Sequence, residues 1–182
     1  MGLDKDFKNL GENILISTDE LEIRTVELAE KISNDYKNSC IDEIILICIL
    51  KGSVLFMADL AKKLTIPNVE LEFMRISSYE NNTTSGEIII KQDLDINIKN
   101  KHIIIIEDII DTGKTLNYLL NYLNQKEPAS VKLCTLLDKP SRRIIDVKVD
   151  YIGFTIEDLF VVGYGLDYMQ KYRNLPYVAH VL

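Results

Sequence analysis

Hydrophobic and polar residues follow one another in two patterns along the chain, one typical of amphipathic helices and the other of buried strands. Apolar residues recur every three or four positions over 18–37, so a helix is predicted there. Ser17 and Glu20 at its start match a capping box. The run from Ile44 to Leu50 is wholly apolar and of strand length. Further strands are predicted at 69–74, 88–91, 103–106, 131–137 and 149–154, and a second helix at 54–64. This alternation indicates an α/β fold with a mainly parallel sheet.

Composition fits a single globular domain, and charge narrows the class of partner. The 182 residues are 47% hydrophobic and 27% charged, and the net charge of −7 disfavours a general nucleic-acid surface. The apolar runs are strand-sized and the first ten residues are too polar for a signal peptide, so we expect a cytoplasmic protein without a membrane partner. Cys40, Cys48 and Cys134 have no paired spacing and are interpreted as reduced core residues.

The densest candidate chemistry lies in residues 103–115, IIIIEDIIDTGKT. Glu107 and Asp108 directly follow the predicted strand 103–106, and ligands of open parallel sheets bind beyond such strand ends. The two acids are either plain polar strand-end residues or ligand contacts, and the third acid, Asp111, favours contacts. The small-residue turn from Asp111 to Thr115 opens a predicted helix and is suited to bind a phosphate. The acidic pair is suited to ribose hydroxyls or to an oxygen-ligated metal.

The motif also resembles a nucleotide-binding loop, and a polar stretch precedes it in the chain. Gly113-Lys114-Thr115 is similar to the end of a Walker A loop, but Asp108 occupies the position of that motif's first glycine. A carboxylate there would repel a phosphate, which excludes a nucleoside triphosphatase. The polar stretch 77–87 is either a solvated hairpin loop or a mobile lid, and its residues alone favour the loop.

The thirteen-residue motif resembles the phosphoribosyl-pyrophosphate (PRPP) signature of the type I phosphoribosyltransferases, and its EDIIDTGKT form is similar to that of the hypoxanthine-guanine enzymes. Further matches follow in the family's order, at 50–52, 78–79, Lys139, 160–167 and 172–175, so the resemblance covers about 12–182. It implies one domain, 1–182, with a five-stranded, mainly parallel sheet flanked by helices. It also implies a core at about 38–140 and a small hood from about 1–17 and 141–182.

The resemblance also implies a role for each matched residue. Asp111 is the candidate acid/base at purine N7. Residues expected to bind PRPP through its ribose and 5′-phosphate are Glu107, Asp108, Ile109, Asp111, Thr112, Gly113, Lys114 and Thr115. Pyrophosphate contacts are expected from Lys51, Gly52 and Arg173, where the Leu50–Lys51 peptide can be cis, and purine contacts from Lys139, Phe160, Val161 and Asp167. Mg²⁺ is expected at Glu107, Asp108 and Asp167, and Ser78 and Tyr79 belong to a flexible loop, now favoured as a lid.

The implied reaction is a purine-salvage transfer. The 5-phosphoribosyl group of PRPP would pass to N9 of hypoxanthine or guanine, giving IMP or GMP plus pyrophosphate, with Mg²⁺ as cofactor. Three alternatives stay open: preference for xanthine or uracil, a PRPP-sensing regulator that binds RNA, and a purely structural subunit. The acidic charge and the pair Asp111 and Lys139 argue against the regulator. We expect a homodimer or homotetramer.

Overall fold

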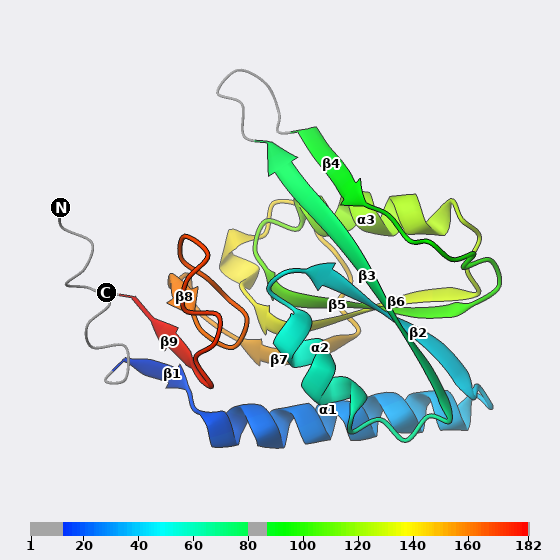
Figure 1. Cartoon of the computed structure of the whole chain (residues 1–182), viewed down its shortest axis with the longest axis horizontal. Coiled ribbons are helices and arrows are strands. Elements are labelled where there is room, and N and C mark those ends of the chain that lie inside the picture. The colour runs from blue at the N-terminus through cyan, green and yellow to red at the C-terminus, as the bar shows by residue number, and fades with distance from the viewer. Residues whose placement is uncertain (1–12, 80–86, 182) are drawn as a thin grey trace.

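Six strands form the central sheet of the computed structural model, which describes residues 13–79 and 87–181 (Figure 1). Their order is β4-β3-β2-β5-β6-β7, and every neighbouring pair is parallel except β3 and β4. The bounds are β2 Glu43–Leu50, β3 Asn68–Tyr79, β4 Glu87–Gln92, β5 His102–Ile110, β6 Ser130–Asp138 and β7 Tyr151–Thr155. The mainly parallel α/β sheet is confirmed. It has one strand more than the five expected, because β4 adds to the edge as an antiparallel partner of β3.

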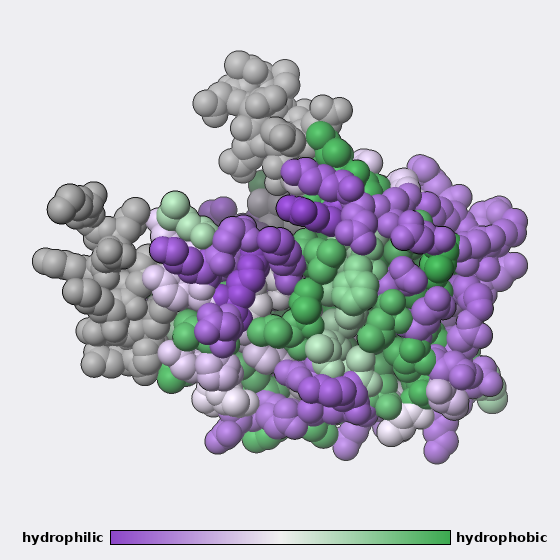
Figure 2. All heavy atoms as spheres, viewed as in Figure 1, coloured by the Kyte–Doolittle hydropathy of each residue, from purple (hydrophilic) through white to green (hydrophobic). Residues whose placement is uncertain are grey.

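Helices cover both faces of this sheet, as parallel strands require (Figure 1). Helices α1, Thr18–Asn38, and α2, Val54–Ala61, lie on one face, and α3, Lys114–Asn124, lies on the other. Alternate residues of β2 and β5 therefore enter two separate cores. Figure 2 shows apolar side chains exposed among hydrophilic ones on the face that α2 and β3 occupy, where Leu55 and Leu71 are 38% and 43% exposed. No helix in the described ranges is both long and apolar enough to cross a membrane.

The start of α1 confirms the predicted capping box. Glu20 N donates to Ser17 Oγ at 3.2 Å, and Ser17 N donates to Glu20 Oε2 at 2.8 Å. These two bonds satisfy backbone donors that the first turn of a helix otherwise leaves without partners. The helix consequently begins one residue after Ser17 and carries its apolar stripe along the sheet.

A second, small sheet joins the two ends of the chain at the left of Figure 1. It consists of β1, Ile14–Ile16, β9, Val178–His180, and β8, Val161–Val162, in that antiparallel order. Strand β7 lies within the range that the resemblance assigned to the hood, but it is the edge strand of the central sheet, because it pairs with β6.

The cysteines divide between core and surface. Cys48 and Cys134 are buried in β2 and β6, as expected. The interpretation of Cys40 as a core residue is wrong, because this residue lies exposed in the turn after α1, with φ of 55°.

Candidate active site

Strand β5 carries the acidic pair further into the sheet than the sequence indicates. The predicted strand ends at Ile106, whereas pairing with β6 continues through Glu107, Ile109 and Ile110. Glu107 Oε2 is buried without a hydrogen-bond partner among the described residues. Burial raises the pKa of the Glu107 carboxyl well above its ordinary value, and the neighbouring Asp108 raises it further. An acid in this environment is suited to accept a hydrogen bond from a ligand or to bind a cation.

The residues expected to hold pyrophosphate meet at Asp108. A Cβ on Gly52 would lie 1.4 Å from Asp108 Oδ2, and a Cβ on Gly165 would lie 1.9 Å from Gly52 O. Only glycine permits either approach, and Gly165 also has φ of +102°. Burial raises the pKa of Asp108, while the positive charge of Arg173 opposes this rise. The loop after β2 is therefore pressed between the end of β5 and the C-terminal segment.

Arg173 contacts the C-terminal residues that lie beside Gly52. Its Nη1 donates to Gly165 O at 2.6 Å, and its Nη2 lies 2.6 Å from Asp167 Oδ1. Gln170 links the loop to Lys51, because its backbone N donates to Asp167 Oδ2 and its Oε1 accepts from Lys51 Nζ at 3.2 Å. Arg173 Nε is buried without a partner among the described residues. The Leu50–Lys51 peptide is cis. These contacts join Lys51, Gly52 and Arg173 in one cluster with Asp108 and Asp167. Such an arrangement of charges is suited to a diphosphate and a divalent cation.

The turn expected to bind the 5′-phosphate leads directly into α3. Gly113 has φ of +81°, and a Cβ there would lie 2.3 Å from Ile145 O. Thr112 O accepts hydrogen bonds from the backbone N of Ile144 and Ile145, both at 3.0 Å. A pocket of about 140 Å³ opens over the turn; it is lined by Glu107, Ile109, Ile110, Asp111, Thr112, Gly113, Thr115 and Leu116. Helix α3 begins at Lys114, directly after this turn, and the N-terminus of a helix is suited to an anion. The turn predicted to bind phosphate thus lines a pocket beside the start of a helix, and Lys114 at the start of that helix is exposed.

Residues expected to read the purine lie beside this turn. Lys139 is only 8% exposed; its Nζ donates to Leu159 O and lies 3.8 Å from Asp158 Oδ1. Phe160 is 52% exposed, and its ring meets Tyr168 edge-on at a centroid distance of 5.8 Å. About half of Phe160 is thus exposed, which suits stacking on a flat ligand, and Val161 follows it in β8. The carboxylate of Asp167 pairs with Arg173, a residue expected to contact pyrophosphate.

Asp111 is held by arginines that the sequence motifs did not indicate. Arg142 Nε donates to Asp111 Oδ1 at 2.9 Å, and Arg143 Nε donates to Asp111 O at 3.2 Å. Arg143 also pairs with Asp138 at the end of β6. Both arginines belong to the segment after Lys139, where two adjacent basic residues are the only available signal.

The predicted lid falls largely outside the described residues. Ser78 and Tyr79 form the last backbone pairs of β3, opposite Ile88 and Glu87 of β4. Their side chains and residues 80–86 are outside the part of the chain that the structure describes. The lid therefore stays a prediction.

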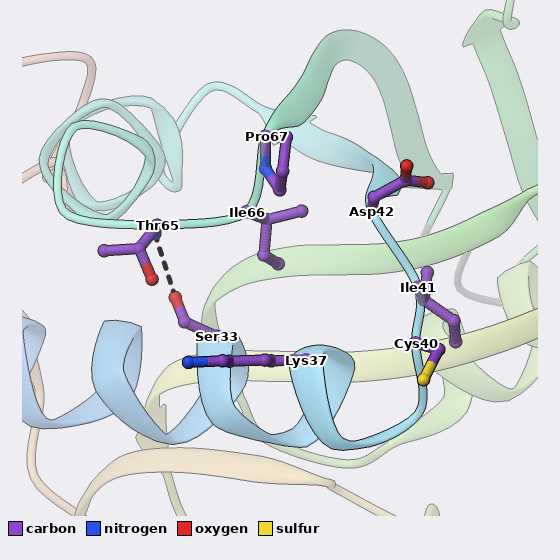
Figure 3. Close-up of a pocket in the computed structure, with 8 residues that line it drawn as sticks. All are labelled: Ser33, Lys37, Cys40, Ile41, Asp42, Thr65, Ile66 and Pro67. Atoms are coloured by element: carbon purple, nitrogen blue, oxygen red, sulfur yellow. Dashed lines mark hydrogen bonds between the residues drawn. The ribbon is translucent and has the colours of Figure 1, made fainter.

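A pocket of about 510 Å³ lies at the opposite end of the sheet and contains none of the predicted site residues (Figure 3). It is lined by Ser33, Lys37, Cys40, Ile41, Asp42, Thr65, Ile66 and Pro67. These residues precede β2 and β3 or belong to the end of α1, and Thr65 N donates to Ser33 Oγ at 3.0 Å across it.

Comparison with known proteins identifies the family to which this chain is similar. Residues 16–169 match the model of the phosphoribosyl transferase domain family. The chain is 48% identical over 171 residues to a hypoxanthine phosphoribosyltransferase of Haemophilus influenzae, covering 93% of this chain and 95% of that protein. It is 44% identical to a hypoxanthine-guanine phosphoribosyltransferase of Streptococcus thermophilus, covering 97% and 94%.

Solved structures give the same result. A hypoxanthine-guanine phosphoribosyltransferase of Bacillus anthracis superposes with a TM-score of 0.87 at 44% identity, covering 93% of this chain and 98% of that one. A hypoxanthine phosphoribosyltransferase of Trypanosoma cruzi gives a TM-score of 0.89 at 38% identity, covering 94% and 91%. The chain therefore belongs to the phosphoribosyl transferase family.

Proposed function

We propose that this protein transfers the 5-phosphoribosyl group of PRPP to N9 of hypoxanthine or guanine, giving IMP or GMP and pyrophosphate. The observation that carries this proposal is the position of Asp108 and Asp111 at one strand end. Asp108 abuts Gly52 in the loop expected to bind the diphosphate, and Asp111 begins the phosphate turn and pairs with Arg142, which follows Lys139 in the chain. This supports the proposal, because residues expected to contact the phosphate, the diphosphate and the purine follow from elements around the end of β5.

The chain's own residues account for most of the catalysis in this proposal. The amides from Thr112 to Thr115 fix the 5′-phosphate, while Lys51 and Arg173 hold the diphosphate and attract the charge that develops as it leaves. Phe160 and Lys139 orient the base, so that its attacking nitrogen faces C1 of the ribose. Asp111 takes up or returns the proton at N7.

Magnesium fits the donors present at the diphosphate end. Asp108 and Asp167 offer carboxylate oxygens there, and Glu107 Oε2 is a buried oxygen that has no hydrogen-bond partner among the residues described. In the described ranges no group of three or more His, Cys, Asp or Glu side chains is arranged to bind a metal ion. Mg²⁺ ordinarily takes one or two carboxylates and completes its shell with water and substrate phosphates, which agrees with this set. When bound, it supplies positive charge to the leaving diphosphate.

The decisive assay is release of pyrophosphate from PRPP and a purine in the presence of Mg²⁺. We expect release with hypoxanthine or guanine, and much slower release with adenine, xanthine or uracil. A higher kcat/KM with xanthine or uracil would replace the proposed substrate. RNA binding at low salt without pyrophosphate release would indicate the regulator instead. A homodimer or homotetramer and a cytoplasmic location remain part of this proposal, and sedimentation analysis tests the first.

A further inference from the structure

Four charged side chains of alternating sign run from the candidate acid/base to the lysine expected to read the purine. Arg142 Nε donates to Asp111 Oδ1 at 2.9 Å, and Arg142 Nη1 lies 3.5 Å from Asp158 Oδ2. The other carboxylate oxygen of Asp158 lies 3.8 Å from Lys139 Nζ. The order is therefore Asp111, Arg142, Asp158 and Lys139, and the sequence motifs include only the two outer residues.

The four residues come from three segments that meet only in the folded chain. Asp111 follows β5, Lys139 and Arg142 follow β6, and Asp158 lies between β7 and β8. The outer two have to contact neighbouring atoms of one ligand, because N7 and the 6-oxo group of a purine lie on the same edge. The separation between the Asp111 carboxylate and the Lys139 ammonium therefore has to match that edge.

Stability does not account for the two inner residues. The side chains of Asp111, Arg142 and Asp158 are 44%, 49% and 51% exposed, and ion pairs at such positions contribute little to folding. An arginine, however, has a rigid planar fork that can contact two carboxylates at once, which a lysine cannot reproduce. The arrangement thus suits the fixing of a distance better than the holding of the fold.

We propose that Arg142 and Asp158 are positioning residues that set the spacing between Asp111 and Lys139, so that proton transfer at N7 and reading of the 6-oxo group depend on each other. This inference rests on the proposed function. Arg142 holds the Asp111 carboxylate toward the purine. Asp158 steadies the Lys139 ammonium and holds the second arm of Arg142.

Arg142→Gln, Asp158→Asn and the double variant test this inference. Each single change is expected to lower kcat/KM for hypoxanthine about tenfold, since small displacements of reacting groups are costly. The KM for PRPP should stay within about twofold, and melting temperatures within about 2 °C. Because the two residues act as one unit, the double variant should also lose about tenfold rather than the roughly hundredfold product of independent effects.

Glu27→Gln is the matched control, because it breaks an arginine–carboxylate pair of similar exposure on α1, Arg24 with Glu27. Its kinetics should equal those of the wild type. If either single variant is within twofold of the wild type, or the double variant loses more than about thirtyfold, the inference is overturned while the proposed function stands. An inactive wild-type chain would overturn both, so the same assay separates the two failures.

Discussion

The two ends of the central sheet differ in what they bring together. The pocket at the amino end is the larger, at about 510 Å³ against about 140 Å³ over the phosphate turn. Its walls include Ile41, Ile66 and Pro67, and its charged groups are Lys37 and Asp42. At the carboxyl ends of the strands, segments from distant parts of the chain converge with opposed charges, a close glycine contact and buried polar atoms that have no partner among the described residues. In this molecule, chemistry is indicated by convergence rather than by empty space.

The largest effect is expected from a side chain added at the close glycine contact, which lies at the carboxyl ends of the strands. We expect Gly165→Ala to lower kcat/KM for PRPP roughly 10²-fold, because the new Cβ would displace Gly52, which itself abuts Asp108. Gly163→Ala is the matched control: this glycine also has positive φ, of +99°, and its Cβ would meet Tyr177 O instead. Both variants should lose about 1–3 kcal/mol of stability through backbone strain, measured by denaturant unfolding. Equal kinetic losses in the two would contradict the special role of the carboxyl end.

Removing the candidate acid/base should cost nearly as much. Asp111→Ala is expected to lower kcat roughly 10²-fold or more, while PRPP affinity measured by calorimetry changes little. Asp146→Ala removes an exposed carboxylate from the nearby segment and should leave kcat unchanged. Full turnover in the Asp111 variant would remove its assignment.

Lys139→Met tests the residue expected to contact the purine. Loss of a charge-assisted hydrogen bond to the 6-oxo group should reduce the preference for hypoxanthine over adenine, measured as a ratio of kcat/KM values, roughly 10- to 100-fold. Lys148→Met, at an exposed lysine paired with Asp150, serves as the control. An unchanged ratio would mean that another group reads the 6-position.

Glu107 allows a test of stored instability at the site. The pKa of Glu107 is raised in the folded state. As pH rises above the unfolded-state pKa of about 4.3, Glu107 loses its proton in the unfolded chain but keeps it in the folded one. The protein therefore loses stability with rising pH until the folded-state pKa is passed. Glu107→Gln should therefore stabilise the ligand-free protein at pH 8 by about 1 kcal/mol, and not at pH 4, as measured by thermal unfolding. A gain of the same size at both values would show that the carboxyl is not the cause.

The smallest effect is expected at the amino end. Cys40 is exposed, whereas burial raises the pKa of the Cys48 thiol to about 11 and also raises that of Cys134. A maleimide should therefore label Cys40 alone in the native protein, since reactivity follows the thiolate. Mass spectrometry should show one adduct, and kcat and KM should stay within about twofold. Inactivation on labelling would show that the amino-end pocket matters to the reaction.

The sequence predicted the elements that local patterns encode and missed those that depend on distant partners. The capping box at Ser17 and the helix after it follow from neighbouring residues. The continuation of β5 through Glu107 does not, because two acids lower the strand signal and only pairing with Thr135 and its neighbours in β6 extends the strand. The family motifs brought Lys51, Gly52 and Arg173 to one place. They gave no signal for Arg142, whose partners Asp111 and Asp158 lie on other segments.

The backbone from Lys139 to Ile145 fixes more than the orientation of two arginines. Lys139 N bonds to Ile110 O at its start, and Ile145 N bonds to Thr112 O at its end. Both ends of the segment are thus hydrogen-bonded to the backbone around Asp111. These bonds constrain the length of the segment. A residue inserted or deleted there would shift the purine contacts and the cover over the phosphate turn together. Substitutions of side chains in this stretch can therefore change substrate preference. A change in the length of the loop would disrupt the site instead.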